Sequence, residues 1–295
     1  MVSVDLAPLD GALRARLTEP AWRAIWDARV EAHDWSRSLP RALAPLPDDV
    51  RRDSAEHDAE DPAHERVHAA TEVACGAAVG VDVVTSSHRP TAPTTGLVAT
   101  VGLLGTAAAQ VVRPVAPVAT LGDRSPEHTH TVGPAGPAAR TLAVGDGVEI
   151  SAYDPRQLTR ELARLLPATT EPSDGLDLPA HERVVTLPAE LAATATKALR
   201  EDNAATARTA CQLAGLDEVP ALLEALTELR GTASLSFRSP RVRRQQRLLA
   251  CHLGWVELTP TTRGTTLHLL THTELVGSWV SALSFAINER TGVAS

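Results

Sequence analysis

Residues 216–287 decide the fold, and they begin Leu216-Asp-Glu-Val-Pro-Ala-Leu-Leu-Glu-Ala-Leu-Thr-Glu-Leu-Arg230. Apolar residues recur in this opening at the spacing of one helical face, and Asp217 stands where an N-cap is expected. Three stretches that alternate small or apolar with polar residues follow, as half-buried strands do: 233–238, 254–259 and 265–270. We expect an arginine-rich connection between the first two stretches and a turn at 260–264 between the last two.

The segment closes with a second predicted helix over residues 274–287. Its apolar face is predicted to be Leu275, Trp279, Leu283 and Ile287. The order is therefore helix, strand, strand, strand, helix.

A weaker version of this order occupies the first half of the chain. A helix is predicted over 62–75 and another opens at Asp154-Pro155, with strands between them at 81–85, 97–104, 109–113, 140–144 and 148–153. Residues 86–96 and 122–139, rich in Gly, Pro, Ser, Thr and His, are expected to form long loops. The repeated order predicts an α+β fold of two topologically similar, quasi-twofold halves, with antiparallel sheets flanked by helices.

The predicted boundaries follow the change in pattern between the halves. We expect an N-terminal α/β half over residues 1–167, a connecting segment over 168–183 and a C-terminal α/β half over 184–295, packed as one globular unit. The connecting segment is acidic and lacks periodicity. Apolar residues make up 43% of the chain, enough for a sizeable core.

Composition narrows the class of partner and the compartment. The formal charge of −8 argues against nucleic acid or an anionic membrane as a general partner. Cys75, Cys211 and Cys251 are far apart and odd in number, so they are expected to be reduced core thiols. The sequence has no signal-peptide pattern and no apolar run of about 18 residues, which predicts a cytoplasmic protein without membrane insertion.

The sharpest chemical motif is His64-Glu-Arg-Val-His68, an HExxH string on a predicted helix. Two histidines at this spacing share a helical face and can bind zinc, with the glutamate as general base. Arg66 places a cation inside the motif, and no second motif supplies a clear third ligand, although Glu72, Glu127, His128 and His130 are possible ones. A zinc-dependent metallopeptidase is therefore kept as the alternative function, and a solvated helix face is preferred.

Other motifs carry less chemistry. His128-Thr-His130 is interpreted as an exposed turn. Five arginines are interpreted as a solvated face, and contact with an acidic partner is kept as the alternative: Arg238, Arg241, Arg243, Arg244 and Arg247. The glycines form neither a Walker A loop nor GxGxxG, and GxSxG is absent. We therefore assign no catalytic residue, metal ligand or cofactor.

The order of elements resembles the EspG family of type VII (ESX) secretion chaperones of actinobacteria. In the second half, the likeness covers the helices around Cys211-Gln-Leu-Ala-Gly-Leu216, then Ser234-Leu-Ser-Phe-Arg238, and then Trp255-Val-Glu-Leu-Thr-Pro-Thr-Thr-Arg-Gly264, which is similar to the family's strand into a "DTPxGR" turn. In the first half, residues 17–26 are similar to its opening "LT-x-x-E-x-x-x-LW" helix, and Leu162-Ala-Arg-Leu-Leu-Pro167 to its "LLP".

The resemblance implies a cytosolic chaperone without enzymatic activity. Members of the family bind the tip of the PPE subunit of PE/PPE heterodimers and cover its apolar patch until export. No motif transfers partner-binding residues, which stay unknown at this stage. From the pattern of residues we expect the partner surface around the strands at 97–112 and the helices at 189–229, because antiparallel sheets can leave one face open and these helices are rich in Ala and Leu.

Overall fold

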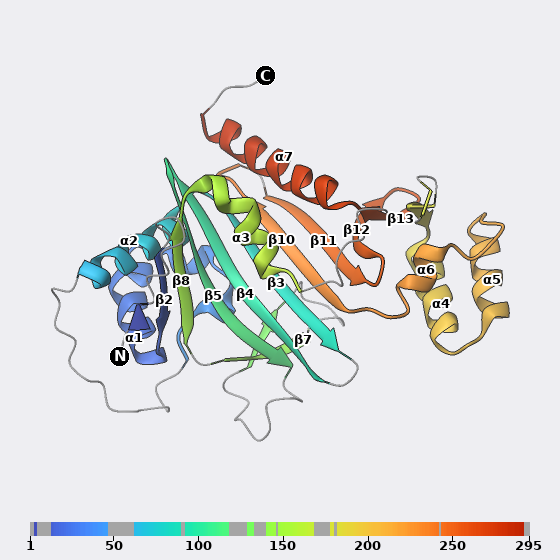
Figure 1. The fold of residues 1–295 in the computed structure, drawn as a ribbon, viewed down its shortest axis with the longest axis horizontal. Helices are drawn as coiled ribbons and strands as arrows, with labels where there is room; N and C mark the ends of the chain where they lie inside the picture. The colour runs from blue at the N-terminus through green and yellow to red at the C-terminus, as the bar shows by residue number, and fades with distance from the viewer. Residues whose placement is uncertain are drawn as a thin grey trace.

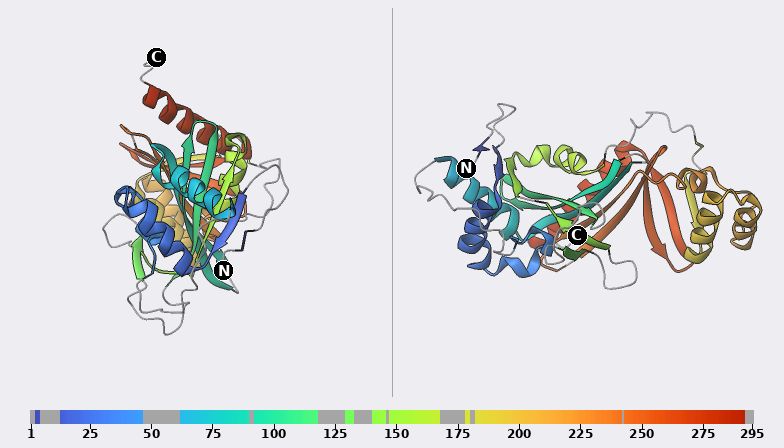
Figure 2. Two further views of the ribbon diagram at one scale, coloured as in Figure 1. Left: turned by 90° about the vertical axis from the view of Figure 1, so that its left-hand side faces the viewer. Right: turned by 90° about the horizontal axis from the view of Figure 1, so that it is seen from below.

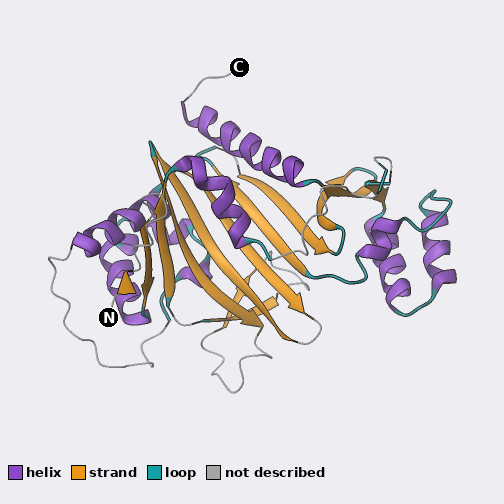
Figure 3. Ribbon diagram, in the orientation of Figure 1, coloured by secondary structure: helices purple, strands orange, loops and turns teal. Residues whose placement is uncertain are grey.

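The structure is a computed structural model that describes residues 3–4, 13–46, 62–89, 92–117, 129–132, 140–145, 147–167, 178–179, 182–241 and 243–291. It consists of one antiparallel sheet with helices on both faces (Figure 3). The predicted α+β class, an antiparallel sheet flanked by helices, is confirmed.

The first half contributes the blue to green elements of Figure 1. Its strands are β1 (Ser3–Val4), β2 (Leu13–Leu17), β3 (Val79–Arg89), β4 (Ala92–Leu104), β5 (Ala107–Pro117), β6 (Thr129–Val132), β7 (Arg140–Val144) and β8 (Val148–Tyr153). Its helices are α1 (Glu19–Ile25), α2 (Pro62–Gly76) and α3 (Leu158–Leu165), with a π-helical turn η1 (Trp26–Glu31) and the 3-10 turns η2 (Trp35–Ser38), η3 (Arg41–Leu43) and η6 (Pro155–Gln157).

The second half contributes the yellow to red elements. It contains β9 (Val184–Leu187), α4 (Ala189–Arg200), α5 (Ala204–Leu213), α6 (Ala221–Ala225), β10 (Gly231–Arg238), β11 (Arg243–Cys251), β12 (Gly254–Thr261), β13 (Gly264–Leu270) and α7 (His272–Thr291). Helix α7 begins in a capping box, in which the Glu274 backbone N–H donates to Thr271 Oγ1 and the Thr271 N–H donates to Glu274 Oε2.

The two halves meet where β3 pairs with β10 in the middle of the sheet. The strand order is β1-β2-β8-β5-β4-β3-β10-β11-β12-β13-β9, with β7 also on β5 and β6 on β7. Counting outward from this pair, β3, β4, β5, β8 and β2 correspond in order to β10, β11, β12, β13 and β9, whereas β1, β6 and β7 have no counterpart among the described strands. That a twofold rotation superimposes the halves stays a prediction, as do the domain boundaries.

Two predictions in the second half are wrong. The helix expected over 217–230 is only α6, because Pro220 has an extended ψ of 138° and the helix starts after it. The arginine-rich connection is part of β11, which pairs with β10 from Arg243 to Ala250. Pairing with a neighbouring strand fixes β11, although its first residues are polar.

Two turn predictions also change. Residues 86–89 and 92–96 continue β3 and β4 as one long hairpin instead of a loop. Pro260 and Thr261 stay in β12, so the turn before β13 is Thr262–Arg263.

Of the loop expected at 122–139, Thr129–Val132 is the strand β6, and Arg140, which directly follows the loop, begins β7; the remaining residues of that loop lie outside the described part.

The two faces of the sheet carry different cores. On one face, a continuous core joins α3 and α7 to strands of both halves, and it includes Val83, Leu162, Leu235 and Trp279. On the opposite face lie two separate cores. One packs under α1, η1 and α2, and the other packs under α4, α5 and α6. The views in Figures 1 and 2 place these two groups of helices at opposite ends of the molecule.

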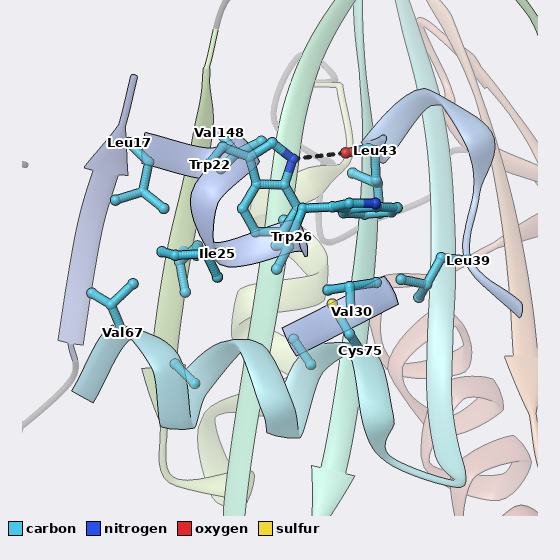
Figure 4. Packing of buried hydrophobic residues seen from close by; sticks show 14 of the residues in the cluster. Leu17, Trp22, Ile25, Trp26, Val30, Leu39, Leu43, Val67, Cys75 and Val148 are labelled. Atoms are coloured by element: carbon cyan, nitrogen blue, oxygen red, sulfur yellow. Dashed lines mark hydrogen bonds between the residues drawn. The ribbon is translucent and has the colours of Figure 1, made fainter. Parts of the chain in front are cut away.

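The indoles of Trp22 and Trp26 fill the first of these separate cores, as predicted. Both side chains are buried, and their rings meet edge to face at 5.5 Å (Figure 4). Trp22 Nε1 donates a hydrogen bond of 2.8 Å to the carbonyl oxygen of Leu43. The bond ties α1 to η3 and satisfies the only polar atom of a fully buried side chain.

The cysteines behave as predicted. Cys75, Cys211 and Cys251 are buried and not in disulfides. Burial raises the pKa of Cys75 to about 12, although the Arg238 cation opposes this rise. The thiol is therefore protonated and weakly nucleophilic at neutral pH.

Candidate functional site

The HExxH motif lies on α2, but its neighbours suit a structural contact. Arg29 Nε donates to Nδ1 of His68 at 3.2 Å, and Arg29 Nη1 pairs with Glu72 at 2.9 Å. The Arg29 guanidinium therefore contacts both His68, the second histidine of the motif, and Glu72, which lies one helical turn further along α2. A cation so close opposes a divalent metal at the same place. Glu65 is exposed, and the side chain of His64 lies outside the described residues.

The other possible ligands lie wholly or partly outside the described residues. His130 is in β6, but its side chain is outside the described part, as are Glu127 and His128. Among the described residues, no group of three or more His, Cys, Asp or Glu side chains is placed to hold a metal ion.

A more distinctive feature is the strip of sheet between the two separate helix-covered cores. We call it the open face and define it by Asp82 and Ser86 of β3, Thr232, Ser234 and Ser236 of β10, and Arg247 of β11. Cross-strand pairing sets these side chains side by side: Ser236 with Asp82, Thr232 with Ser86, and Ser234 with Arg247. Except for buried Asp82, they are half-buried or exposed. The side chains between them, such as Val83 and Leu235, point into the continuous core.

One end of the open face is a charged cluster. Asp82 Oδ1 lies 3.0 Å from Arg238 Nε and accepts a hydrogen bond of 2.9 Å from Thr100, while Arg243 lies 3.6 Å from Oδ2. Arg238 also donates to Thr100 Oγ1 at 2.9 Å. Burial raises the pKa of Asp82 above its ordinary 3.8, against the opposing effects of Arg238 and Thr100. The cluster links β3, β4, β10 and β11.

We expect the contribution of Asp82 to the free energy of unfolding to fall as pH rises. Because the folded state binds its proton more tightly than the unfolded chain, the contribution to stability is complete in acid and is lost as pH increases above about 4. The excess stability of the native chain over Asp82→Asn should therefore shrink as pH rises through that window. Urea unfolding of both proteins at a series of pH values measures it, and an excess that grows with pH contradicts the raised pKa.

The other end of the open face is a cluster of hydrogen bonds between hydroxyl groups and an imidazole. Ser86 Oγ lies 2.8 Å from Thr232 Oγ1 and 3.2 Å from His88 Nε2, and His88 Nδ1 lies 3.4 Å from Thr94 Oγ1. A hydroxyl beside Nδ1 cannot stabilise an imidazolium as the carboxylate of a catalytic triad does. The geometry favours hydrogen bonding over nucleophilic catalysis.

Two pockets lie near these elements. One of about 310 Å³ adjoins the charged cluster and is lined by residues that include Trp35, Ser38, Cys75, Arg238 and Arg243. The other, of about 350 Å³, lies beside the π-helical turn. Its charged lining is balanced, with Arg23 and Arg41 facing Asp27 and Glu31. The first lining has no carboxylate or imidazole to act as a base, and the second has Ser36 with the carboxylates of Asp27 and Glu31 but no histidine.

The partner surface expected around the strands at 97–112 and the helices at 189–229 stays a prediction. In the strand region, Leu104 at the end of β4 is 48% exposed. At 97–112, β4 and β5 are largely buried on both faces, because α2 packs on one side and α3 on the other. In the helices at 189–229, an exposed leucine ends α5, and two apolar residues that follow it in the chain pack against the core under α4, α5 and α6. Leu213 is 73% exposed, and Leu216 and Val219 are half-buried. We call these three residues the α5 tip.

Sequence reasoning missed the open face. A signal was present, since Thr232, Ser234 and Ser236 supply only hydroxyls at alternate positions of one strand. The local sequence pattern does not indicate that this strand lies in the middle of the sheet, because its neighbour β3 is far away in the sequence.

Comparisons with known proteins add no assignment. No protein-family model matches the sequence, and no match is found among curated proteins. Among the described helices, none is both long enough and apolar enough to cross a membrane.

Proposed function

We propose that the chain is a non-enzymatic cytosolic chaperone of a type VII secretion system that binds PE/PPE heterodimers through the PPE subunit. The proposal rests on the resemblance of residues 17–26, 162–167 and 211–264 to the EspG family. An α+β fold with antiparallel strands and terminal helices in both halves agrees with what that resemblance implies.

The exposed α5 tip is the observation that supports a particular binding surface for the PPE subunit. A leucine that is 73% exposed at the end of a helix, beside half-buried Leu216 and Val219, is an apolar anchor without cover among the described residues. A chaperone that covers an apolar patch on its client needs such a complementary surface. An interface of standard size buries about 800 Å² on each partner around an apolar centre.

We expect Leu213→Glu to weaken binding of the PE/PPE pair by about tenfold or more, because a charge desolvated at an interface centre costs several kcal/mol. The same change should leave the free protein folded, since the side chain contacts mainly solvent. Gln212→Glu is the matched control, because it adds the same charge at the neighbouring exposed position.

Isothermal titration of the purified pair with each variant measures the affinities, and thermal unfolding confirms that the variants are folded. A folded Leu213→Glu protein that binds as tightly as Gln212→Glu would remove the α5 tip from the interface.

A further inference from the structure

One side of strand β11 is paired along nearly all of the strand, whereas the other side is paired only in part. It pairs with β10 from Arg243 to Ala250, but with β12 only from Leu248 to Cys251. Residues 243–247 therefore have a free edge, because no strand of the described structure pairs with it. Free edges of this kind are templates for an added strand.

The facing strand confirms that the sheet divides here. β12 pairs with β11 only as far as Glu257, and residues 258–261 pair with β13 alone. Pro260 lies in this part of β12 and has no N–H to donate to a neighbour on either side. The gap between the strands is thus a regular part of the fold.

The free edge has a strong local charge in an otherwise acidic chain. Arg241, Arg243, Arg244 and Arg247 are exposed on or just before it. Among the described residues, Asp82 pairs with Arg243 at 3.6 Å, and no carboxylate lies within ion-pair distance of Arg244 or Arg247. The formal charge of the whole chain is −8, so this positive strip differs in sign from the chain as a whole.

Charged residues can also serve only to prevent aggregation at sheet edges. The outer edge strand of the same sheet argues against that explanation here. β9, Val184-Val-Thr-Leu187, has no charged residue, and Val184 is 46% exposed. β9 itself therefore carries no charge, whereas arginines lie along the inner edge of β11, a contrast that favours recognition over edge protection alone.

We propose that the free edge of β11, residues 243–247, binds an extended acidic segment of a partner protein by strand addition. Five residues of the added strand span about 17 Å. Its backbone pairs with the free N–H and C=O groups of β11, and its carboxylates meet Arg243 and Arg247 on one face of the sheet and Arg244 on the other. This surface is distinct from the α5 tip and does not depend on the secretion client.

Fluorescence anisotropy with a labelled decapeptide that repeats Glu-Glu-Thr-Thr, which puts glutamates on both faces of an extended strand, tests the proposal. We expect the native chain to bind it and the triple variant Arg243→Gln, Arg244→Gln, Arg247→Gln to bind at least about tenfold more weakly, because charge-assisted hydrogen bonds are lost. The control triple Arg156→Gln, Arg208→Gln, Arg263→Gln changes the net charge equally at exposed or half-exposed sites elsewhere and should bind normally. Unchanged thermal unfolding midpoints verify that both triples are folded.

A second peptide separates strand addition from simple charge attraction. Methylation of every backbone nitrogen keeps every carboxylate and removes the donors from both edges of the peptide, so it should abolish binding. If the methylated and unmethylated peptides bind with equal affinity, strand addition is overturned. If the two arginine triples bind the peptide with equal affinity, the free edge of β11 is not the binding site. Absence of peptide binding, or tighter binding of a single-stranded oligonucleotide, overturns the acidic protein segment as the ligand.

Discussion

Replacing Arg113 with methionine is expected to lower the free energy of unfolding by about 3 to 5 kcal/mol, the usual cost of leaving a buried charge without its partner. The Arg113 side chain is fully buried, and its Nη2 donates to both oxygens of Glu19 at 3.1 Å. Its Nη1 donates to the Ala44 carbonyl. The same carboxylate accepts from the backbone N–H groups of Leu46 and Gly147. One pair thus ties α1, the segment after η3, and the turn before β8 to β5.

Two further variants show that burial sets the size of this effect. Arg16→Met removes an exposed arginine 3.8 Å from Glu149 and should cost at most about 1 kcal/mol. Glu19→Leu combined with Arg113→Met removes both charges and should cost less than the sum of the single changes. Denaturant unfolding is measured for the native chain, the single variants Arg113→Met, Glu19→Leu and Arg16→Met, and the double variant. A cost for Arg113→Met as small as that for Arg16→Met contradicts a buried, structurally essential pair.

Trp279→Ala is expected to cost about 3 to 5 kcal/mol, as truncation of a buried aromatic residue does. Trp279 is fully buried in the core that joins strands of both halves. Its Nε1 donates to Gln246 Oε1 at 3.0 Å, and the amide nitrogen of Gln246 donates to Glu257 and Ser278. Truncation therefore leaves a cavity and an unpaired buried amide oxygen.

The neighbouring Val280→Ala is the control, because Val280 is 49% exposed and its truncation should change stability by less than about 1 kcal/mol. Trp279→Phe keeps most of the apolar volume and should fall between the two. Near-equal unfolding midpoints for Trp279→Ala and Val280→Ala would falsify the assignment of α7 to a shared core.

Elements with strong periodicity could be predicted from the sequence. α3 buries Leu158, Leu162 and Leu165 on one face, and β10 alternates, because each buries one face against a core. α7 was also predicted, although Val280 and Phe285 place apolar side chains on its exposed side too. Even there the ends depend on packing. Ile287 was placed on the buried face of α7, but it is 44% exposed.

Elements fixed by distant partners could not be predicted. The first residues of β11 are polar and become a strand because β10 pairs with them. The sequence also does not reveal that β3 lies beside β10, two strands from opposite halves of the chain. That neighbour relation creates the open face, so its polar residues appear in the sequence only as the outer sides of two separate strands.

Co-expression with each PE/PPE pair encoded by the source organism, followed by purification through a tag on this chain, tests the central claim most directly. The proposal predicts that at least one pair is retained in equal amounts of each subunit and is more soluble than when expressed without the chain. Failure to retain any pair, with no gain in the solubility of any, contradicts it.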